Sequence, residues 1–367
     1  MKHIICLLIF CGLLFSCADE KPKTHVLFPN MEMPHKEVCT ENNKSSDLSD
    51  IFKDYKLIPL QTRDCCLLEG KSPKIIKKFN KFFIKSINEI LIFNSDGVFL
   101  KKLSQCGLGP QEYIEISDFD VVELDNSKEI WIASELRILR YNIDSLTYID
   151  EIPFSFFVNT LKYIDNGNII VSSPDDKVFK IIDVSGDIKK SFLDKNLAIT
   201  GIKPVNFVKI NNNIISQLSN SNDAVCYSIN DKKFALIKIL QNPGNIETID
   251  IDKIFYKKFG YLKQNPMIWE KYVIISSFRK VGNQSIVILR YPDDSWYMCT
   301  SNGETVNSYC YFPEHCSTIH NNISPQSLNK FYNTMICGES EDSFLFIVNS
   351  PSEDNKNPKI LEVFSLA

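Results

Sequence analysis

The sequence predicts an all-β fold, a six-bladed β-propeller of four-stranded antiparallel blades. Short β-forming runs separated by turn residues fill residues 51–367, where helical periodicity is almost absent. A unit of apolar strand, turn and apolar strand recurs six times. Four short strands take roughly 40 to 50 residues, the size of one blade, whereas two-sheet sandwiches generally end well before such a length. The units are centred near Leu91, Trp131, Ile169, Ile214, Val273 and Leu345.

Turn residues support this reading of the strands. A strand predicted at 89–93 leads through Asp96-Gly97 into a strand at 98–100, and Ser185-Gly186 separates two later strands. Glycine is favoured in such hairpins because their turns need positive φ. The best helical candidate covers residues 251–259, which we interpret as an insertion between strands.

The two ends of the repeat region are both strand-like. Residues 56–60 open it and residues 360–364 close it, and both runs are rich in Leu, Ile and Val. A ring of blades leaves no open faces only if its first and last pieces meet. We therefore expect the N- and C-terminal strands to share one blade and to close the ring.

The start of the chain has the composition of an export signal. Lys2 and His3 precede an apolar run over residues 4–15 that is too short to span a bilayer comfortably and ends at Ser16-Cys17. This junction resembles a bacterial lipobox, in which the cysteine is acylated and begins the mature chain. We expect a signal peptide over 1–16, lipidation of Cys17, and a polar tether over 17–50 that holds a short strand near residues 26–33. The membrane is then a partner through the lipid anchor.

Four stretches are similar to the 6-bladed β-propeller lipoprotein family of Gram-negative bacterial envelopes. They are residues 57–62, 92–103, 107–113 and 357–364. The chain departs from the family pattern at Gln111, where a glycine is usual, and at Gln61, where an acid is usual. The resemblance implies an exported, lipid-anchored propeller of the outer membrane, in either leaflet, often associated with nutrient uptake. It implies no ligand and no reaction.

The glycine-rich stretch within that resemblance has several possible roles. It leads into a predicted strand and no Gly-Lys-Ser/Thr follows, so it lacks the strand-to-helix setting of a phosphate loop. We interpret it as an inter-blade loop with structural side chains; a ligand-facing role for Glu112 or Tyr113 is the alternative. The family-motif residues are Gly107, Gly109, Pro110, Glu112 and Tyr113.

The net charge and the number of cysteines limit which partners and which disulfide bonds the sequence predicts. The formal net charge is -4 and no basic run stands out, which excludes nucleic acid as an expected partner. Of 12 cysteines, nine follow Cys17, an odd number that cannot pair fully within one chain. A two-residue turn at Asn302-Gly303 would set Cys299 opposite Val306, so that Cys299 and Cys310 are not cross-strand partners. Buried free thiols are the preferred interpretation.

No motif for metal or cofactor chemistry is convincing. His315, Cys316 and His320 form the one plausible metal group, but their spacing is weak for zinc, so we predict a surface loop, no metal and no cofactor. Asp118 and Asp120 lie on one face of one predicted strand and would point into the central channel if that strand is innermost. General acid–base work or Ca²⁺ binding there is the alternative to a structural role.

The function that these observations favour is a binding or scaffold module of the cell envelope, linked to nutrient uptake, with an envelope protein complex or a glycan as candidate partner. The alternative is a propeller enzyme, a lyase or hydrolase acting on a glycan or lactone through channel carboxylates. An enzyme would gather acids with shifted pKa values at one mouth of the channel. A binding module would show a mixed polar or aromatic rim.

Overall fold

The protein, seen in a computed structural model, is described over residues 25–32, 51–69, 73–125, 127–194, 207–218, 222–241, 273–291, 296–311, 338–348 and 357–367. Cys17, the signal segment 1–16, the helical candidate 251–259 and the group His315, Cys316 and His320 lie outside these residues. No helix within the described ranges is long and apolar enough to cross a membrane.

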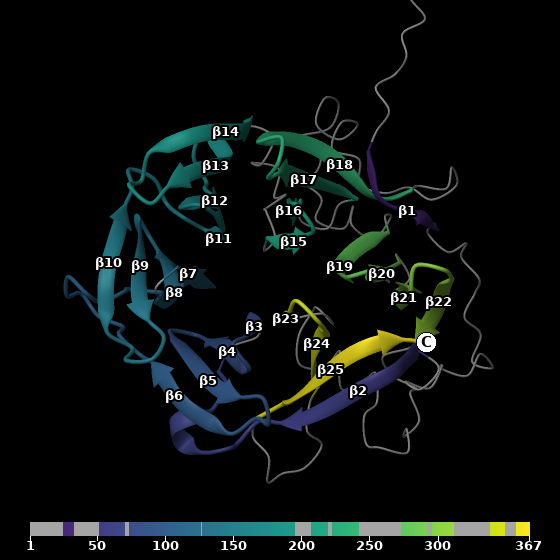
Figure 1. The fold of residues 1–367 in the computed structure, drawn as a ribbon, viewed down its shortest axis with the longest axis horizontal. Helices are drawn as coiled ribbons and strands as arrows, with labels where there is room; N and C mark the ends of the chain where they lie inside the picture. Colours follow the sequence, from purple (N-terminus) through teal and green to yellow (C-terminus); the bar gives the residue numbers. More distant parts are fainter. Residues whose placement is uncertain are drawn as a thin grey trace, which may run out of the picture.

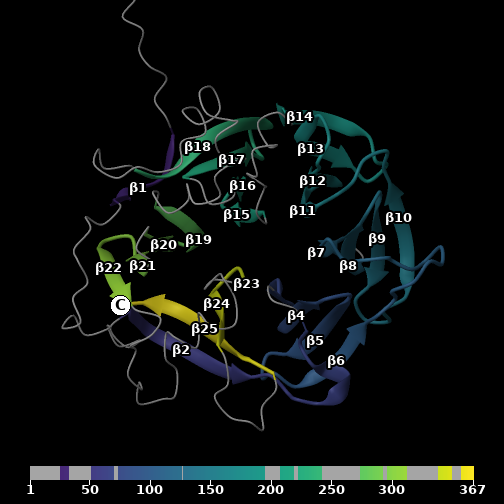
Figure 2. The same cartoon turned by 180° about the vertical axis from the view of Figure 1, so that it is seen from behind.

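The predicted six-bladed propeller is confirmed: six small sheets surround one axis (Figure 1), and the view from behind shows the same ring (Figure 2). The elements in chain order are β1 (Val26–Glu32), β2 (Phe52–Pro59), η1 (Asp64–Cys66), β3 (Ile75–Lys78), β4 (Lys81–Ser86), β5 (Glu89–Asn94), β6 (Phe99–Leu103), β7 (Asp118–Leu124), β8 (Ser127–Ser134), β9 (Arg137–Asn142), β10 (Tyr148–Pro153), β11 (Thr160–Asp165), β12 (Asn168–Ser172), β13 (Lys177–Asp183), β14 (Ile188–Asp194), β15 (Val208–Ile210), β16 (Asn213–Gln217), β17 (Asp223–Ser228), β18 (Lys233–Gln241), β19 (Ile274–Val281), β20 (Gln284–Arg290), β21 (Trp296–Ser301), β22 (Val306–Tyr311), β23 (Gly338–Glu339), β24 (Phe344–Val348) and β25 (Lys359–Leu366).

Each blade runs from an inner strand at the axis to an outer strand at the rim. Blades one to five are β3–β6, β7–β10, β11–β14, β15–β18 and β19–β22. The closing blade consists of β23, β24, β25 and β2. Its inner strand β23 contacts β24 but is hydrogen-bonded to β3 of blade one, with which it pairs in parallel; the hydrogen-bonded sheet of the closing blade is β24, β25 and β2. The inner strands are therefore β3, β7, β11, β15, β19 and β23.

The two ends of the chain close the ring, as the sequence predicts. Strand β2 pairs antiparallel with β25, with Leu57 opposite Leu361 and Ile58 opposite Ile360. Figure 1 shows β2 and β25 side by side at the edge of the molecule. Strand β25 also pairs with β24, so the last strand lies between an N-terminal and a C-terminal strand.

The hydrophobic core is divided among the blade interfaces. Each of six clusters of buried side chains joins two adjacent blades, including the pair formed by the closing blade and blade one. Trp131, fully buried, fills the interface between blades two and three. Alternation of side chains along each strand supplies both faces of a blade with apolar groups, so every blade needs two neighbours.

Gly97 shows why a glycine is required in one of the predicted hairpins. Its φ is +81°, and a Cβ there would lie 2.1 Å from the carbonyl oxygen of Pro59. The Gln61 backbone N–H donates to the Gly97 carbonyl at 2.8 Å. The turn between β5 and β6 thus packs directly on the chain that leaves the closing blade.

Strand β1 occupies part of the segment predicted as a tether. It pairs in parallel with β18 and adds a fifth strand to the outer edge of blade four. Phe28 and Met31 are buried there, between blades four and five. The short strand predicted near residues 26–33 is present, and it belongs to the propeller.

The register predicted around Asn302-Gly303 was wrong. Cys299 lies opposite Ser308, and Cys310 lies opposite Tyr297. Asn302 Oδ1 accepts hydrogen bonds from the backbone N–H groups of residues 304 and 305, which fixes a four-residue connection in place of a two-residue turn. The conclusion that these cysteines are not cross-strand partners still follows from the observed register.

Five cysteines in the described part of the chain are free thiols: Cys65, Cys66, Cys106, Cys226 and Cys299. Cys226 and Cys299 are buried, and burial raises the pKa of each thiol to about 11. Such thiols remain protonated at neutral pH and behave as small apolar side chains.

Candidate binding cavity on the propeller axis

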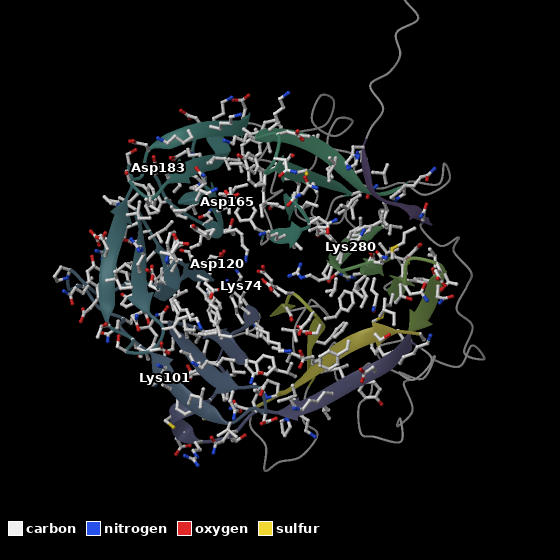
Figure 3. All side chains as sticks on the ribbon, viewed as in Figure 1. Lys74, Lys101, Asp120, Asp165, Asp183 and Lys280 are labelled. Carbon is white, nitrogen blue, oxygen red and sulfur yellow. The ribbon has the colours of Figure 1, made fainter. Side chains whose placement is uncertain are left out.

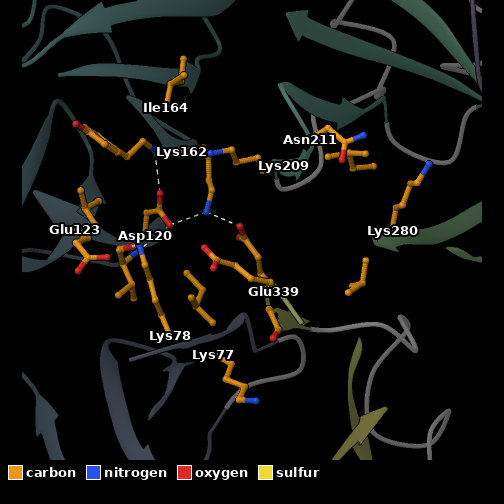
Figure 4. Close-up of a pocket in the computed structure, with 18 of the residues that line it drawn as sticks. Lys77, Lys78, Asp120, Glu123, Lys162, Ile164, Lys209, Asn211, Lys280 and Glu339 are labelled. Atoms are coloured by element: carbon orange, nitrogen blue, oxygen red, sulfur yellow. Dashed lines mark hydrogen bonds and ion pairs between the residues drawn. The ribbon is translucent and has the colours of Figure 1, made fainter. Parts of the chain in front are cut away.

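A cavity of about 490 Å³ lies on the axis of the ring, and all six inner strands line it (Figure 4). We call it the axial cavity. Its volume falls within the range of about 300 to 1,000 Å³ that is typical of small-molecule sites. Its charged lining residues are Lys77, Lys78, Asp120, Glu123, Lys162, Lys209, Lys280, Glu339 and Glu341.

Asp118 ties three neighbouring blades together. Its Oδ1 accepts a hydrogen bond from Nζ of Lys74 on the segment entering β3, at 2.9 Å. Its Oδ2 accepts one from the backbone N–H of Leu161 on β11, also at 2.9 Å. Both side chains of the ion pair are more than nine-tenths buried. Asp118 lies on the innermost strand of its blade, as its predicted channel position requires, but it is not among the residues that line the axial cavity.

Asp120 repeats this arrangement one step along the same face of β7. Its Oδ1 accepts a hydrogen bond from Lys162 Nζ at 2.9 Å, and its Oδ2 accepts one from the Tyr163 backbone N–H at 2.9 Å. Unlike Asp118, it lines the axial cavity. The two aspartates thus bind alternate N–H groups of β11 in the next blade, which is possible because alternate residues of a strand share a face.

Lys162 extends the second ion pair across the channel. Its Nζ lies 2.5 Å from Oε1 of Glu339, which stands on β23 of the closing blade. Figure 4 shows the lysine bridging Asp120 and Glu339. Blade three and the closing blade lie on opposite sides of the ring, so this network spans the axis.

The members of this network hold one another in their charged forms. Burial disfavours the charge on Lys162, but Asp120 and Glu339 outweigh it and raise the pKa of the ammonium group. Burial likewise disfavours the charge on Glu339, but Lys162, Lys74 and Arg279 lower the pKa of its carboxyl below the ordinary value. Neither group is suited to exchange protons near neutral pH.

Two other lysines line the axial cavity but take no part in this network of ion pairs. Lys209 on β15 and Lys280 on β19 come from neighbouring blades, and neither has an ion-pair partner within the described ranges. Figure 3 places Lys280 beside the channel, with Lys74 and Asp120 on the far side of it. Lys78 differs, because its Nζ donates to the Val121 carbonyl at 3.2 Å.

The family-motif loop lies between β6 and β7, away from the axial cavity. Gly109 N–H donates to Glu112 Oε2 at 2.8 Å, and a Cβ on Gly107 would lie 2.0 Å from the same oxygen. Arg137 of blade two donates to the carbonyl oxygens of Pro110 and Glu112, at 3.4 and 2.8 Å. The side chain of Glu112 therefore closes its own loop, and the backbone of the loop docks on blade two.

Tyr113 is buried beneath this loop. The carbonyl oxygens of Asn88 and Leu103 in blade one lie 3.0 and 3.2 Å from its hydroxyl, whose single hydrogen they share. Burial raises the pKa of this phenol to about 12. None of the five motif residues is among those that line the axial cavity.

Sequence reasoning singled out Asp118 and Asp120 but missed the lysines and Glu339. A signal for the lysines was present. A lysine stands in an apolar inner strand shortly before an Asn-containing turn in four blades, at Lys78, Lys162, Lys209 and Lys280. Glu339 lies in a two-residue strand that shows no periodicity. Within the described ranges, no three His, Cys, Asp or Glu side chains are grouped as a metal site would require.

The fold is shared with a solved structure of distant sequence. A protein of Bacteroides fragilis that is described as exported is 18% identical, with a TM-score of 0.66 over 88% of this chain and 97% of that one. A member of the DUF4221 family from Bacteroides vulgatus is 10% identical, with a TM-score of 0.49 over 89% of this chain and 99% of that one. No curated protein matches the sequence. The family model described as "Domain of unknown function (DUF4934)" matches residues 34–362, and the chain therefore belongs to this family.

Proposed function

We propose that this protein is an exported, lipid-anchored β-propeller that acts as a binding module of the cell envelope, with the axial cavity as its ligand site. The observation that carries the proposal is the cavity itself, of about 490 Å³ and lined by all six inner strands. Lys209 and Lys280 face it with no ion-pair partner among the described residues. A concave site with a few unpaired polar groups is typical of ligand binding.

The ion pairs favour binding over the alternative of a propeller enzyme. Asp118 and Asp120 each use one oxygen for a lysine and the other for a backbone N–H of blade three. Glu339 has a lowered pKa, whereas a general acid at neutral pH needs a raised one. These carboxylates therefore hold the blades in register, and catalysis is not needed to explain them.

The envelope location rests on the chain's N-terminus. The apolar run before Cys17 has the form of an export signal with a lipidation site. A polar segment between a lipid-bearing cysteine and the ring would hold the propeller at a membrane surface, where it would serve a nutrient-uptake complex. The proposed location is the outer membrane, in either leaflet.

Binding is tested by a thermal-shift screen of small metabolites, glycan fragments and peptides against the purified propeller. We expect at least one probe to raise the melting temperature of the wild-type protein. The double variant Lys209→Met/Lys280→Met should lose that shift, while the exposed Lys53→Met on β2 should keep it. A shift that survives in the double variant contradicts the assignment of the site.

Anchoring is tested separately with Cys17→Ser. Two or more acyl chains anchor a protein stably, because each buried CH₂ contributes about 0.8 kcal/mol. We expect the wild-type protein in the membrane fraction and the variant in the soluble fraction. Retention of the variant on membranes contradicts lipidation at this cysteine.

A further inference from the structure

Glu339 carries an unused hydrogen-bond acceptor at the axial cavity. Its Oε1 accepts from Lys162, but its Oε2 is buried and has no hydrogen-bond partner among the residues that the structure describes. Buried carboxylate oxygens are almost always paired, because leaving one unpaired costs stability. The neighbouring cations hold this carboxyl ionised, so Oε2 is an acceptor for an N–H or O–H donor.

Unpaired positive charge lies on two other blades around the same cavity. Lys209 and Lys280 line it without an ion-pair partner in the described part of the chain, and Asn211 lies beside them in the lining. Lys209 is exposed and Lys280 is half-buried, so both ammonium groups are accessible to a ligand. The cavity thus presents an acceptor from the closing blade and donors from blades four and five.

Part of the remaining lining is aliphatic, and Glu123 and Glu341 add two further carboxylates to it. Ile164, Ile210 and Val281 contribute apolar surface from three successive inner strands, and Tyr163 is the one aromatic residue among those that line the cavity. Sugar sites usually offer exposed aromatic faces for stacking, so this wall suits an aliphatic group better than a pyranose ring.

We infer that the axial cavity binds a small zwitterion of the amino-acid or short-peptide type, with its ammonium group on Glu339 Oε2 and its carboxylate on Lys209 or Lys280. This inference rests on the proposed binding function and specifies its ligand class. A simple anion would satisfy the lysines but leave Oε2 unpaired, and a simple cation would do the reverse. A molecule that carries both charges pairs with the lysines and with Glu339 Oε2, and its aliphatic side chain packs against the apolar part of the lining.

The ligand class is tested by calorimetric titration of the purified propeller with four probes of similar size. These are alanyl-leucine, its N-acetyl form, its C-terminal amide and glucuronate. We expect alanyl-leucine to bind, and each blocked form to bind at least tenfold more weakly. Glucuronate binding as tightly as the dipeptide, or equal binding of the blocked forms, overturns the inference.

Variants assign each end of the ligand to its residues. Glu339→Gln should weaken the dipeptide at least tenfold but change N-acetyl-alanyl-leucine little, because the acetylated probe has no ammonium group. Lys209→Met/Lys280→Met should weaken the dipeptide but change the amide little. The exposed Glu304→Gln and Lys53→Met are matched controls that should bind as the wild type does.

The same experiments separate the two proposals. Loss of binding in Glu339→Gln counts only if its melting temperature shows a folded protein. The lysine variants break no ion pair among the described residues and provide the second measure. If the dipeptide fails while another screened probe binds in a lysine-dependent way, the zwitterion is overturned and the binding function stands. If no probe binds the wild-type protein, both fall.

Discussion

Lys162 Nζ lies 2.5 Å from Glu339 Oε1, so a single ion pair joins blade three to the closing blade across the axis of the ring. The backbone closes the same ring at its rim, where β2 pairs with β25. The ring is therefore closed by hydrogen bonds between strands, at the rim and where β23 pairs with β3, and by charge across the axis. The central tie includes Asp120, which also binds the N–H of Tyr163.

Removing the lysine of this tie should be strongly destabilising. Lys162→Met leaves the carboxylates of Asp120 and Glu339 without their shared cation at 2% and 21% side-chain exposure. Breaking a buried pair in this way costs about 3 to 5 kcal/mol. Urea unfolding measures the loss. The control Lys177→Met removes an exposed pair with Asp194 and should cost less than about 1 kcal/mol; equal losses in both variants would contradict a central tie.

Stability should fall at acid pH through two carboxyls with lowered pKa values. Burial opposes the charge on each, but Lys162, Lys74 and Arg279 lower the pKa of Glu339, and bonds from Arg140, Ser127 and Trp131 lower that of Glu129. A carboxyl whose pKa is lower in the folded state stabilises the protein above its unfolded pKa, ordinarily 4.5, and loses that contribution as pH falls through the folded value.

We therefore expect the free energy of unfolding to be nearly level from pH 7 to about 5 and to decline below about 4.5, as measured by urea titration at each pH. Glu339→Gln should make that decline shallower. The exposed Glu304→Gln should leave it unchanged. A decline of equal steepness in the wild type and in Glu339→Gln would count against the assigned direction of the pKa shift.

Ring closure at the rim predicts a cooperative loss of structure on truncation. Deleting residues 358–367 removes β25, which lies between β2 and β24, and should abolish the thermal transition of the whole ring. Leu361→Ala, at a fully buried site in the same strand, should cost about 2 to 5 kcal/mol. Deleting residues 25–32 removes β1 alone and should lower the transition temperature without loss of cooperativity. An unchanged melting curve after the C-terminal truncation would refute this prediction.

The family-motif loop predicts coupling between Gly107 and Glu112. Gly107→Ala places a methyl group on the Glu112 carboxylate, which must turn away and give up its bond from the Gly109 N–H. Glu112→Ala removes the same bond, worth about 1.5 to 3 kcal/mol because its acceptor is charged. The double variant should therefore cost little more than either single one. Additive losses in a double-mutant cycle would show that the two changes act independently.

The fold was predictable because it repeats. Strand alternation, turn residues and a regular unit length identify six blades, and the apolar pattern around Leu57 and Leu361 identifies the two strands that meet. These signals are local or periodic, and each is present several times. The register around Asn302-Gly303 was the exception, because an Asn side chain that binds two backbone N–H groups makes a longer connection than the dipeptide suggests.

The candidate site was predictable only in part. The shared face of Asp118 and Asp120 follows from strand geometry, but their partners on β11 depend on how two blades pack, which a single strand does not encode. Glu339 has no periodic setting at all, and its position arises from ring closure. Charges that meet only after six units have closed leave no short-range pattern in a sequence.

Strand β1 has a mechanical consequence for a propeller held by its N-terminus. A pull on residues before Val26 reaches the ladder between β1 and β18 on blade four before it reaches β2. That ladder would peel or shear first, and blade four would keep its own four strands. The fifth strand would therefore detach first and keep the applied force from reaching the pairing of β2 with β25.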